Sequence, residues 1–515
     1  MSSSSIEAHE AAVKAIARQV RGFSQRQKPF RIYHGSTNST RASDRRADNI
    51  IDTSQLDHVL SVSKATMTAV VEPNVPMDRL VQATLQHGLI PPVVMEFPGI
   101  TVGGGFSGTS GESSSFRHGA FDTNIAEIEI VLPDGTVTRA SKKERTDIFW
   151  GAASAFGTLG VVTLLEMELL PATKFVRLQY TLCRSADESV IRMRRACDDD
   201  DNDFVDAIVF DQQATLLCVG RRVDELPAGE TPKTFTARGD PWFYTHAEQV
   251  RRRLVAHDHG REHEHQVVDY IPLTDYLFRY DRGGFWVGRH AFAYFITPFN
   301  RVTRYLVDFF MHTRVMYRAL HHSGLADMYM VQDVGVPYDR AAEFQAWLHD
   351  IFGLYPLWLC PLRIHRTDPD SAHGLHSEFA DPRRAVDLVN FGVWGPLDGV
   401  SRRQMVGLNR ALEAKVQQLG GKKWLYAHAY YTEDEFWQNY DRHSYEALRS
   451  KYGADYLPSV WDKVKVDIDG HEAGGSRGRG TWWARCKTAL ADVWPLRGLV
   501  GFFYAAVGGD YLMKK

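Results

Sequence analysis

Cysteines and long apolar runs are scarce in this sequence, and their scarcity excludes several kinds of protein. The 515 residues include only five cysteines, and no two of them form a C-x-x-C pair. This pattern indicates neither a zinc site nor a redox dithiol, so we predict no metal site. No run of about 18 apolar residues occurs, and the N-terminus lacks the apolar core of a signal peptide. We therefore predict no transmembrane span and no signal peptide.

Acidic and basic residues nearly balance, which gives a formal net charge of -3. Because phosphate recognition needs a basic surface, nucleic acid is not expected as the main partner. A chain of 515 residues exceeds the size of one hydrophobic core, so two domains are expected. Residues 1–29 predict an N-terminal helix, because Ala, Val and Ile recur there among Lys, Arg and Gln at helical spacing.

A glycine-rich stretch from Phe97 to Gly119 is the feature around which the rest of the chain is organised. Its glycines free the backbone for positive φ and for close approach to a ligand, and its Ser and Thr residues supply hydroxyls. We interpret it as a loop that wraps a polar ligand. The alternative, a flexible linker, is disfavoured by apolar anchors such as Phe106 and Phe121. The letters from Gly103 to Gly108 match the G-x-G-x-x-G motif, but no helical apolar period follows, so we reject a Rossmann fold.

The segments around this stretch predict strands. Ile125 to Leu132 and Thr136 to Ala140 predict an antiparallel pair joined by a tight turn, and Val161 to Leu170 predicts a long strand. Gly35 to Ser39 follow a short strand near the start of the chain. They predict either an anion-binding nest of backbone N–H groups or an ordinary Ser/Thr turn.

This order of segments resembles a known family of flavoproteins. A short strand and phosphate turn, a Thr101-Val-Gly-Gly loop, and Gly157-Thr-Leu-Gly-Val before a long strand are similar to the FAD-binding, PCMH-type domain of the vanillyl-alcohol-oxidase superfamily. Within it, the string from Thr101 to Ser115 resembles that of the Δ24-sterol reductase (24-dehydrocholesterol reductase) family. Further segments similar to that family extend the resemblance over roughly residues 30 to 465: Pro241-Trp-Phe-Tyr, Asp269-Tyr-Ile-Pro, Val331-Gln-Asp-Val-Gly-Val-Pro, Tyr355-Pro-Leu-Trp-Leu-Cys-Pro and Glu433-Asp-Glu-Phe-Trp.

The resemblance implies an α+β fold in two parts. Residues 30–175 would form a two-part FAD-binding PCMH-type domain and residues 176–468 an α/β substrate-binding cap domain. Residues 469–515 would be a linker followed by an aromatic and basic tail, which is either a peripheral membrane anchor or a helix docked on the cap. The protein would then be cytoplasmic, or peripheral on the cytosolic face of the endoplasmic reticulum.

The resemblance also implies which residues bind FAD. The glycine stretch would lie against the cofactor, and its backbone N–H groups would neutralise the pyrophosphate without a lysine. Many members of the superfamily carry a histidine joined covalently to the flavin, and Asn38 is its best match here, so FAD is expected to be non-covalent. The expected FAD-binding residues are Gly35, Ser36, Thr37, Asn38, Ser39, Thr101, Val102, Gly103, Gly104, Gly105, Phe106, Ser107, Gly108, Thr109, Ser110, Gly111, Glu112, Ser113, Val161 and Val162.

The chemistry implied is reduction of an isolated carbon–carbon double bond in a sterol side chain or another apolar small molecule, with NADPH as the hydride donor. Since such an alkene accepts hydride poorly, the protein must supply an acid. Where the family has His-Arg-His-Thr-Arg, this chain has Phe278-Arg-Tyr-Asp-Arg282. We take Tyr280 as a candidate proton donor, with Arg282 lowering its pKa. Asp333 and Glu112 are further titratable candidates.

Two alternative functions stay open. The chain could instead be an FAD-linked oxidase or dehydrogenase of a small alcohol or secondary metabolite, as other members of the superfamily are. It could also be a flavin- or lipid-binding protein without turnover, because two histidines of the family are replaced here by Phe278 and Tyr280.

Overall fold

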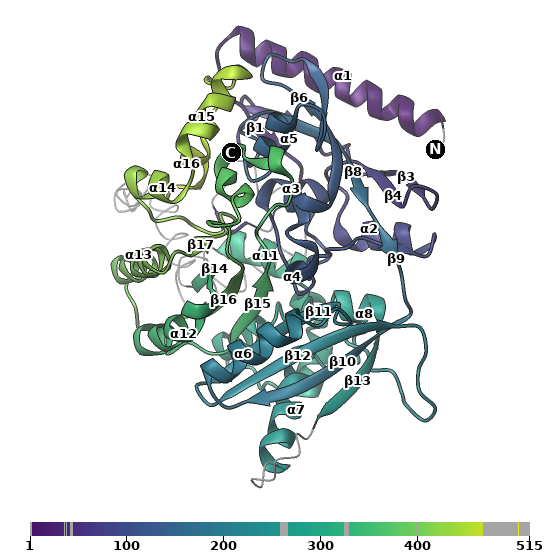
Figure 1. Ribbon diagram of the computed structural model, residues 1–515, viewed down its shortest axis with the longest axis vertical. Helices are drawn as coiled ribbons and strands as arrows, with labels where there is room; N and C mark the ends of the chain where they lie inside the picture. The colour runs from purple at the N-terminus through teal and green to yellow at the C-terminus, as the bar shows by residue number, and fades with distance from the viewer. Residues whose placement is uncertain are drawn as a thin grey trace.

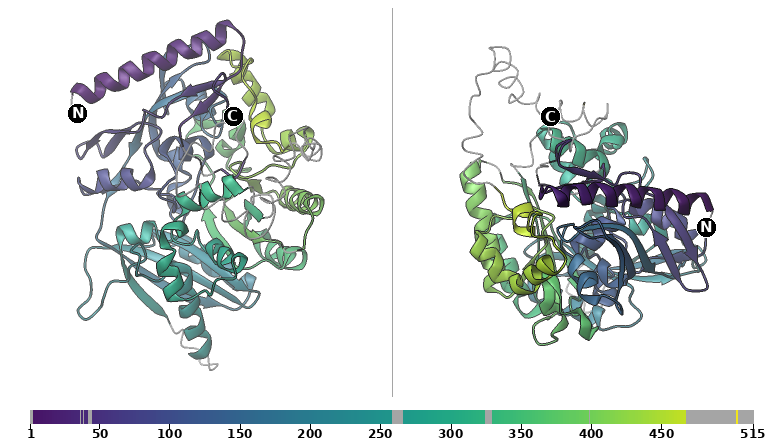
Figure 2. Two further views of the ribbon diagram at one scale, coloured as in Figure 1. Left: turned by 180° about the vertical axis from the view of Figure 1, so that it is seen from behind. Right: turned by 90° about the horizontal axis from the view of Figure 1, so that it is seen from above.

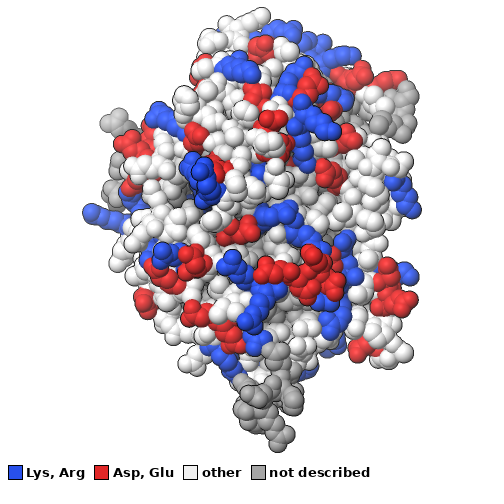
Figure 3. All heavy atoms as spheres, in the orientation of Figure 1, with Lys and Arg blue, Asp and Glu red and all other residues white. Residues whose placement is uncertain are grey.

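The computed structural model describes residues 3–35, 37, 39–41, 45–257, 266–323, 329–397, 399–466 and 503. Two antiparallel sheets with helices around them form the body, and the N-terminal helix lies across one end (Figure 1). This mixture of helices and antiparallel sheets confirms the expected α+β fold. Within the described residues no helix is both long and apolar enough to cross a membrane. The face shown in Figure 3 carries side chains of both charges, in keeping with the nearly neutral chain.

The smaller sheet contains the hairpin and the long strand that the sequence predicts. Its middle strand is the long one, and its edge is the hairpin, in which Val131 pairs with Val137 and Gly135 turns the chain with a φ of 86°. A separate parallel pair of short strands, β1 (Arg31–Tyr33) and β2 (Ile50–Asp52), accompanies this sheet. In order across the sheet the five strands are β3 (Val59–Ser63), β4 (Thr68–Val71), β8 (Val161–Glu168), β6 (Ile125–Val131) and β7 (Val137–Ser141).

The larger sheet has eight strands, and every neighbouring pair is antiparallel. Three helices pack on one of its faces: α6 (Ala186–Cys197), α12 (Tyr338–Phe352) and α13 (Arg402–Gln418). In order across the sheet its strands are β13 (Val267–Pro272), β10 (Phe175–Cys183), β12 (Ala214–Val223), β11 (Phe204–Asp211), β15 (Leu357–Leu362), β16 (Leu388–Pro396), β14 (Tyr329–Pro337) and β17 (Lys422–Lys423).

Strand β15 shows how the two halves of the molecule share this sheet. Successive side chains of a strand point to opposite faces. Leu357 and Leu359 accordingly pack with the three helices, whereas Trp358, Cys360 and Leu362 join the core that contains the smaller sheet. All six residues of β15 are buried, so both faces of the sheet are covered here.

The end of the described chain returns to the domain built on the smaller sheet. The Tyr445 hydroxyl, on α15 (Arg442–Lys451), lies 2.7 Å from Thr158 Oγ1, and the Tyr456 hydroxyl donates to the Pro133 carbonyl over 2.7 Å. Figure 1 and the right panel of Figure 2 show these yellow-green helices close to α1. We therefore infer that α15 and α16 (Val460–Val464) pack with the N-terminal domain, whereas the resemblance implies that residues up to 468 belong to the cap.

The other helices named below or drawn in Figure 1 connect these sheets. They are α2 (Met77–Leu85), α3 (Val102–Gly108), α4 (Ser115–His118), α5 (Thr146–Ala152), α7 (Phe243–His257), α8 (Leu273–Leu277), α9 (Val287–Tyr294), α10 (Arg301–Leu306), α11 (Thr313–Ser323) and α14 (Glu433–Asn439).

The predicted N-terminal helix is α1 (Ser3–Gln25), and a buried histidine fixes it to the smaller sheet. His9 Nδ1 lies 2.8 Å from Glu72 Oε1, and His9 Nε2 lies 3.2 Å from Glu129 Oε1. Burial lowers the pKa of His9, but the hydrogen bonds and charges of the two carboxylates outweigh burial and raise this pKa to about 9. His9 is therefore charged at neutral pH and ties the helix to two acidic partners.

Replacing His9 by Gln should lower the melting temperature near neutral pH and have less effect in alkali. The pKa of His9 in the folded protein is above its ordinary value of 6.5, so the bound proton stabilises the folded state. This contribution is complete below pH 6.5. The contribution is lost as the pH rises through about 9. Thermal unfolding of both proteins across this range measures the difference, and a difference that does not shrink in alkali would contradict the assignment.

Candidate active site

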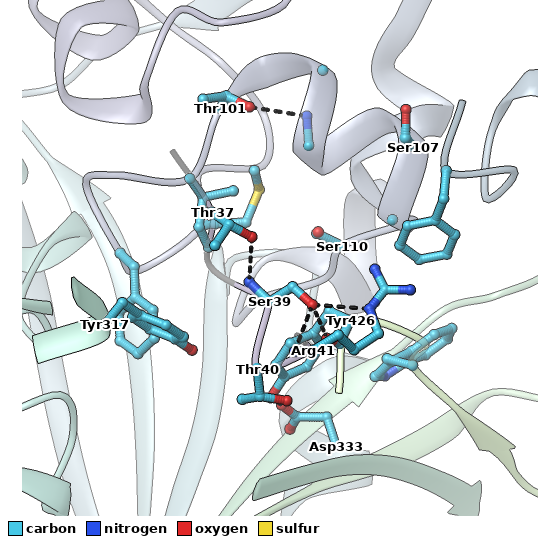
Figure 4. A pocket seen from close by; sticks show the side chains of 18 of the residues that line it. Thr37, Ser39, Thr40, Arg41, Thr101, Ser107, Ser110, Tyr317, Asp333 and Tyr426 are labelled. Carbon is cyan, nitrogen blue, oxygen red and sulfur yellow. Dashed lines mark hydrogen bonds between the residues drawn. The ribbon is translucent and has the colours of Figure 1, made fainter. Parts of the chain in front are cut away.

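A cavity of about 1170 Å³ lies between the two domains and is lined from both. The N-terminal domain contributes Gly104 and Ser107 of the glycine stretch, while β14 and β16 contribute Asp333 and Asn390. Figure 4 shows the hydroxyl groups of Thr101, Ser107 and Ser110 in one part of this cavity and Asp333 with Tyr426 in another.

The expected glycine loop is in fact the short helix α3, so this prediction is corrected. The side chain of Thr101 caps the helix, because its Oγ1 accepts a hydrogen bond of 3.1 Å from the Gly104 N–H. Such a cap offsets the low helix propensity of glycine. Thr109 ends the helix in the left-handed conformation, with a φ of 50°.

Two glycines of α3 allow neighbouring atoms to approach the backbone closely, and neither has a positive φ. A Cβ atom on Gly103 would lie 2.7 Å from Pro73 Cβ, and one on Gly105 would lie 2.6 Å from Met95 Cε and 2.9 Å from Phe121 Cδ1, so a side chain at either position would force its neighbours to move. A Cβ on Gly108 would meet no atom closer than 3.7 Å. The helix is thus packed tightly on its inner side and leaves room on the side of the cavity.

The first N–H groups of α3 already have partners. Those of Val102, Gly103 and Gly104 donate to the Val75 carbonyl, the Pro73 carbonyl and Thr101 Oγ1. These three N–H groups are therefore engaged within the protein, and binding of a pyrophosphate by other N–H groups of the stretch stays a prediction.

Four basic side chains of the cavity wall lie close to one another instead: Arg31, Arg41, Arg45 and Lys463. Burial lowers the pKa of Arg41 to about 10, and the charges of Arg45 and Arg31 add to this shift. Burial also lowers the pKa of Lys463, and the same arginines contribute. Like charges gathered in a half-buried wall favour an anionic ligand that neutralises them. This cluster fits the diphosphate of FAD.

The structure brings half of the expected FAD-binding residues to the cavity. Thr37, Ser39, Thr101, Gly103, Gly104, Ser107, Gly108, Ser110, Gly111 and Val162 line it. The residues that do not line it are Gly35, Val102, Gly105, Phe106, Thr109, Glu112, Ser113 and Val161. Ser36 and Asn38 lie outside the described residues, so non-covalent attachment of FAD stays a prediction.

Asp333 is in the cavity wall, as a catalytic candidate should be. Its carboxylate accepts hydrogen bonds from the Tyr426 hydroxyl over 2.5 Å and from Asn390 Nδ2 over 2.8 Å. Burial raises the pKa of Asp333 to about 6, although the donors of Tyr426, Asn390 and Trp394 oppose the rise. At neutral pH this group is mostly a carboxylate.

Tyr280 and Arg282 do not line the cavity. The Tyr280 hydroxyl donates to Asp206 over 2.8 Å, and Phe285, which does line the cavity, stacks on the Tyr280 ring. Arg282 is held by Asp308, 2.8 Å away. The expectation that Arg282 lowers the pKa of Tyr280 is wrong, because burial and the charge of Asp206 raise that pKa well above its ordinary value. Tyr280 therefore supports the wall from behind through Phe285.

Glu96 is the residue that sequence reasoning missed. It lines the cavity although it is only 7% exposed, and within the described part of the chain its Oε1 has no hydrogen-bond partner. Burial raises the pKa of Glu96 well above its ordinary value, and the charge of Glu112 raises it further. The sequence did contain a signal, since Glu96 is a single carboxyl at the end of the apolar run from Leu89 to Met95.

Aromatic and aliphatic side chains make the remaining wall apolar. The ring centroids of Phe285 and Trp394 are 4.5 Å apart, and those of Phe285 and Trp358 are 5.2 Å apart. Met316 and Val331 also line the cavity. Walls of this kind bind the bulk of an apolar ligand, while a few polar groups orient it.

Residues 8–141 match the model of a protein family described as FAD binding domain, so this part of the chain is an FAD-binding domain. Along most of its length the chain is similar to Δ24-sterol reductases, as the motifs indicated. It is 28% identical over 477 residues to "Delta(24)-sterol reductase" of Homo sapiens, which covers 90% of this chain and 87% of that protein. The "Delta(24)-sterol reductase homolog dhcr-24" of Caenorhabditis elegans is 28% identical over 441 residues, 80% of this chain and 78% of that protein. "Delta(24)-sterol reductase" of Arabidopsis thaliana is 27% identical over 449 residues, 81% of this chain and 76% of that protein.

Replacing Lys463 by Met should weaken FAD binding roughly 10- to 100-fold, because a hydrogen bond to a charged group contributes about 1.5 to 3 kcal/mol. Quenching of flavin fluorescence on titration of the FAD-free protein measures the dissociation constant. Lys451→Met is the matched control, since Lys451 pairs with Asp147 at the surface. Equal affinities of the Lys463 variant and the wild type would show that the basic cluster does not hold the diphosphate.

Proposed function

We propose that this protein reduces the isolated carbon–carbon double bond of a sterol side chain, with FAD as cofactor and NADPH as the hydride donor. The observation that carries the proposal is the cavity itself, because it joins a cationic region suited to FAD with an aromatic region that contains a buried carboxyl. The similarity to Δ24-sterol reductases over most of the chain supports this choice of substrate.

When bound and reduced by NADPH, FAD would supply a hydride to one carbon of the double bond. The protein must then protonate the other carbon, and it needs an acid that is still protonated near pH 7. Basic residues Arg41 and Lys463 would hold the diphosphate, and Phe285, Trp358 and Trp394 would hold the apolar substrate and exclude water.

Glu96 fits the role of this acid better than Asp333. Its Oε1 faces no donor among the described residues, so nothing there favours the charged form at that atom. Its neighbour Glu112 is better satisfied, because it accepts hydrogen bonds from the hydroxyls of Ser113 and Ser114. When two buried carboxyl groups lie close together, the proton stays on the one with fewer donors. We therefore assign the proton to Glu96.

Asp333 differs from Glu96 because hydrogen-bond donors contact both of its carboxylate oxygens. Tyr426 and Asn390 donate to its two carboxylate oxygens, which favours the charged form. An ionised Asp333 would orient the substrate or the flavin through these partners rather than deliver a proton.

Three further elements of the proposal rest on the resemblance rather than on the geometry. These are non-covalent attachment of FAD, NADPH as the reductant, and a peripheral position on the cytosolic face of the endoplasmic reticulum. The C-terminal tail, expected to be either a peripheral membrane anchor or a helix docked on the cap, lies outside the described residues except for Phe503.

The function is tested by adding NADPH and then a Δ24-sterol such as desmosterol to the purified protein without oxygen. We expect NADPH to bleach the flavin and the sterol to restore its colour, with the saturated sterol as product. If an alcohol bleaches the flavin and oxygen restores its colour with release of peroxide, while the sterol has no effect, the protein is an oxidase and the proposal fails.

The assignment of the acid is tested in the same two steps with Glu96→Gln. This variant should be bleached by NADPH at the rate of the wild type, while reoxidation by the sterol should slow roughly 10²- to 10⁴-fold, the usual contribution of general acid catalysis. Asp333→Asn is the comparison variant, and it should slow reoxidation much less than Glu96→Gln, because it removes an orienting group and not the proton donor. The opposite ranking of the two variants would assign the proton to Asp333.

A further inference from the structure

A cluster of exposed apolar side chains lies between residues 296 and 309. Ile296, Val302, Tyr305, Leu306 and Phe309 are 75%, 67%, 48%, 65% and 58% exposed. We call these five residues the apolar patch. Single exposed apolar residues are normal on a protein surface, but several within one short segment mark an interaction site.

Packing within the protein does not account for the patch. Helix α10 buries none of its six residues. At the start of the helix, the side chain of Asn300 accepts hydrogen bonds from the N–H groups of Val302 and Thr303. Arg238 donates a hydrogen bond of 2.8 Å to the Tyr305 carbonyl. Polar contacts thus fix the helix, and its apolar side chains are left to face outward.

The segment that carries the patch contains basic but no acidic side chains from residue 282 to residue 307. Its several arginines include Arg301 and Arg304. Arg238 adds another cation, because its guanidinium lies 4.4 Å from the centre of the Tyr305 ring. The neighbouring acid Asp308 is buried and paired with Arg282. An anionic surface therefore complements this region.

The segments that flank the patch reach the cavity. Val287 of α9 precedes the patch, Met316 and Leu320 of α11 follow it, and all three line the cavity. In the left panel of Figure 2 the teal helices of this segment lie on the side turned to the viewer, opposite the face with mixed charges in Figure 3. The apolar patch and part of the cavity wall therefore belong to one continuous segment of the chain.

We propose that the apolar patch, with Arg238, Arg301 and Arg304 around it, inserts shallowly into a lipid bilayer that carries anionic headgroups. Apolar side chains enter the boundary between headgroups and acyl chains, and basic residues bind the headgroup phosphates, as in other proteins that lie on membranes. Membrane binding by this surface does not rest on the proposed function.

Co-sedimentation with vesicles tests this surface in the FAD-loaded full-length protein. We expect binding to vesicles of phosphatidylcholine with phosphatidylserine and weaker binding to phosphatidylcholine alone. The variant Leu306→Ser/Phe309→Ser should bind at least roughly tenfold more weakly, because two large apolar side chains no longer enter the lipid. Ile191→Ser/Ile351→Ser is the matched control, since these side chains are 52% and 45% exposed on α6 and α12, and it should bind like the wild type.

The basic residues are tested separately. Arg301→Gln/Arg304→Gln should weaken binding to the anionic vesicles by a factor of roughly five per charge, and it should leave binding to neutral vesicles unchanged. In every variant the flavin content and bleaching by NADPH should equal those of the wild type, which separates a failure of this surface from a failure of the proposed function.

Two results would overturn the proposal. One is equal vesicle binding by the wild type and by Leu306→Ser/Phe309→Ser, which would assign any membrane contact to another part of the chain, such as the tail. The other is absence of vesicle binding together with dimers in light scattering that the same variant abolishes. That result would identify the patch as an interface between two copies.

Discussion

One guanidinium faces three buried carboxyl groups in this protein, and the character of the cavity depends on this imbalance. Arg279 is 1% exposed, and its Nη2 lies 2.9 Å from Asp206 Oδ2. Its charge also acts on Glu96 and Glu112, which are buried as well. Because one cation cannot neutralise three anions away from water, at least one of the carboxyl groups keeps its proton. The hydrogen bonds to Asp206 and Glu112 leave Glu96 as that group.

The same ion pair shapes the apolar wall. Asp206 accepts hydrogen bonds from Arg279, from the Tyr280 hydroxyl and from Trp358 Nε1, the last over 3.1 Å. Tyr280 then supports the stacked ring of Phe285, and Trp358 and Phe285 face the cavity together. The neutral acid and the aromatic surface beside it therefore both depend on the ion pair of Arg279 and Asp206. This combination suits protonation of an apolar double bond and has little use in the oxidation of a small polar alcohol.

Local patterns in the sequence predicted local structure well. The hairpin of β6 and β7, the long strand β8 and the helix α1 follow from apolar spacing and from turn residues, and all are present. The glycine stretch was wrongly predicted as a loop, because its helix depends on the Thr101 cap and on close packing against Pro73 and Met95. Such packing partners are distant in the sequence and cannot be recognised from composition.

The catalytic candidates show the same limit. Tyr280 and Arg282 were chosen by their place in a motif, but the direction of a side chain depends on tertiary partners, here Asp206 and Asp308. Lys463 reaches the cavity only because the C-terminal helices return to the first domain. Glu96 could have been noticed as a single carboxyl in an apolar run, yet its value as an acid depends on Glu112 and Arg279 beside it.

The central claim is that Glu96 is a neutral carboxylic acid in the folded protein at neutral pH. Infrared spectroscopy measures this directly, because the carbonyl stretch of a protonated carboxyl group is separate from the bands of a carboxylate. The account predicts that the wild-type spectrum at neutral pH contains a protonated-carboxyl band that Glu96→Gln lacks and Asp333→Asn retains. If Glu96→Gln removes carboxylate bands instead, Glu96 is ionised and cannot be the proton donor.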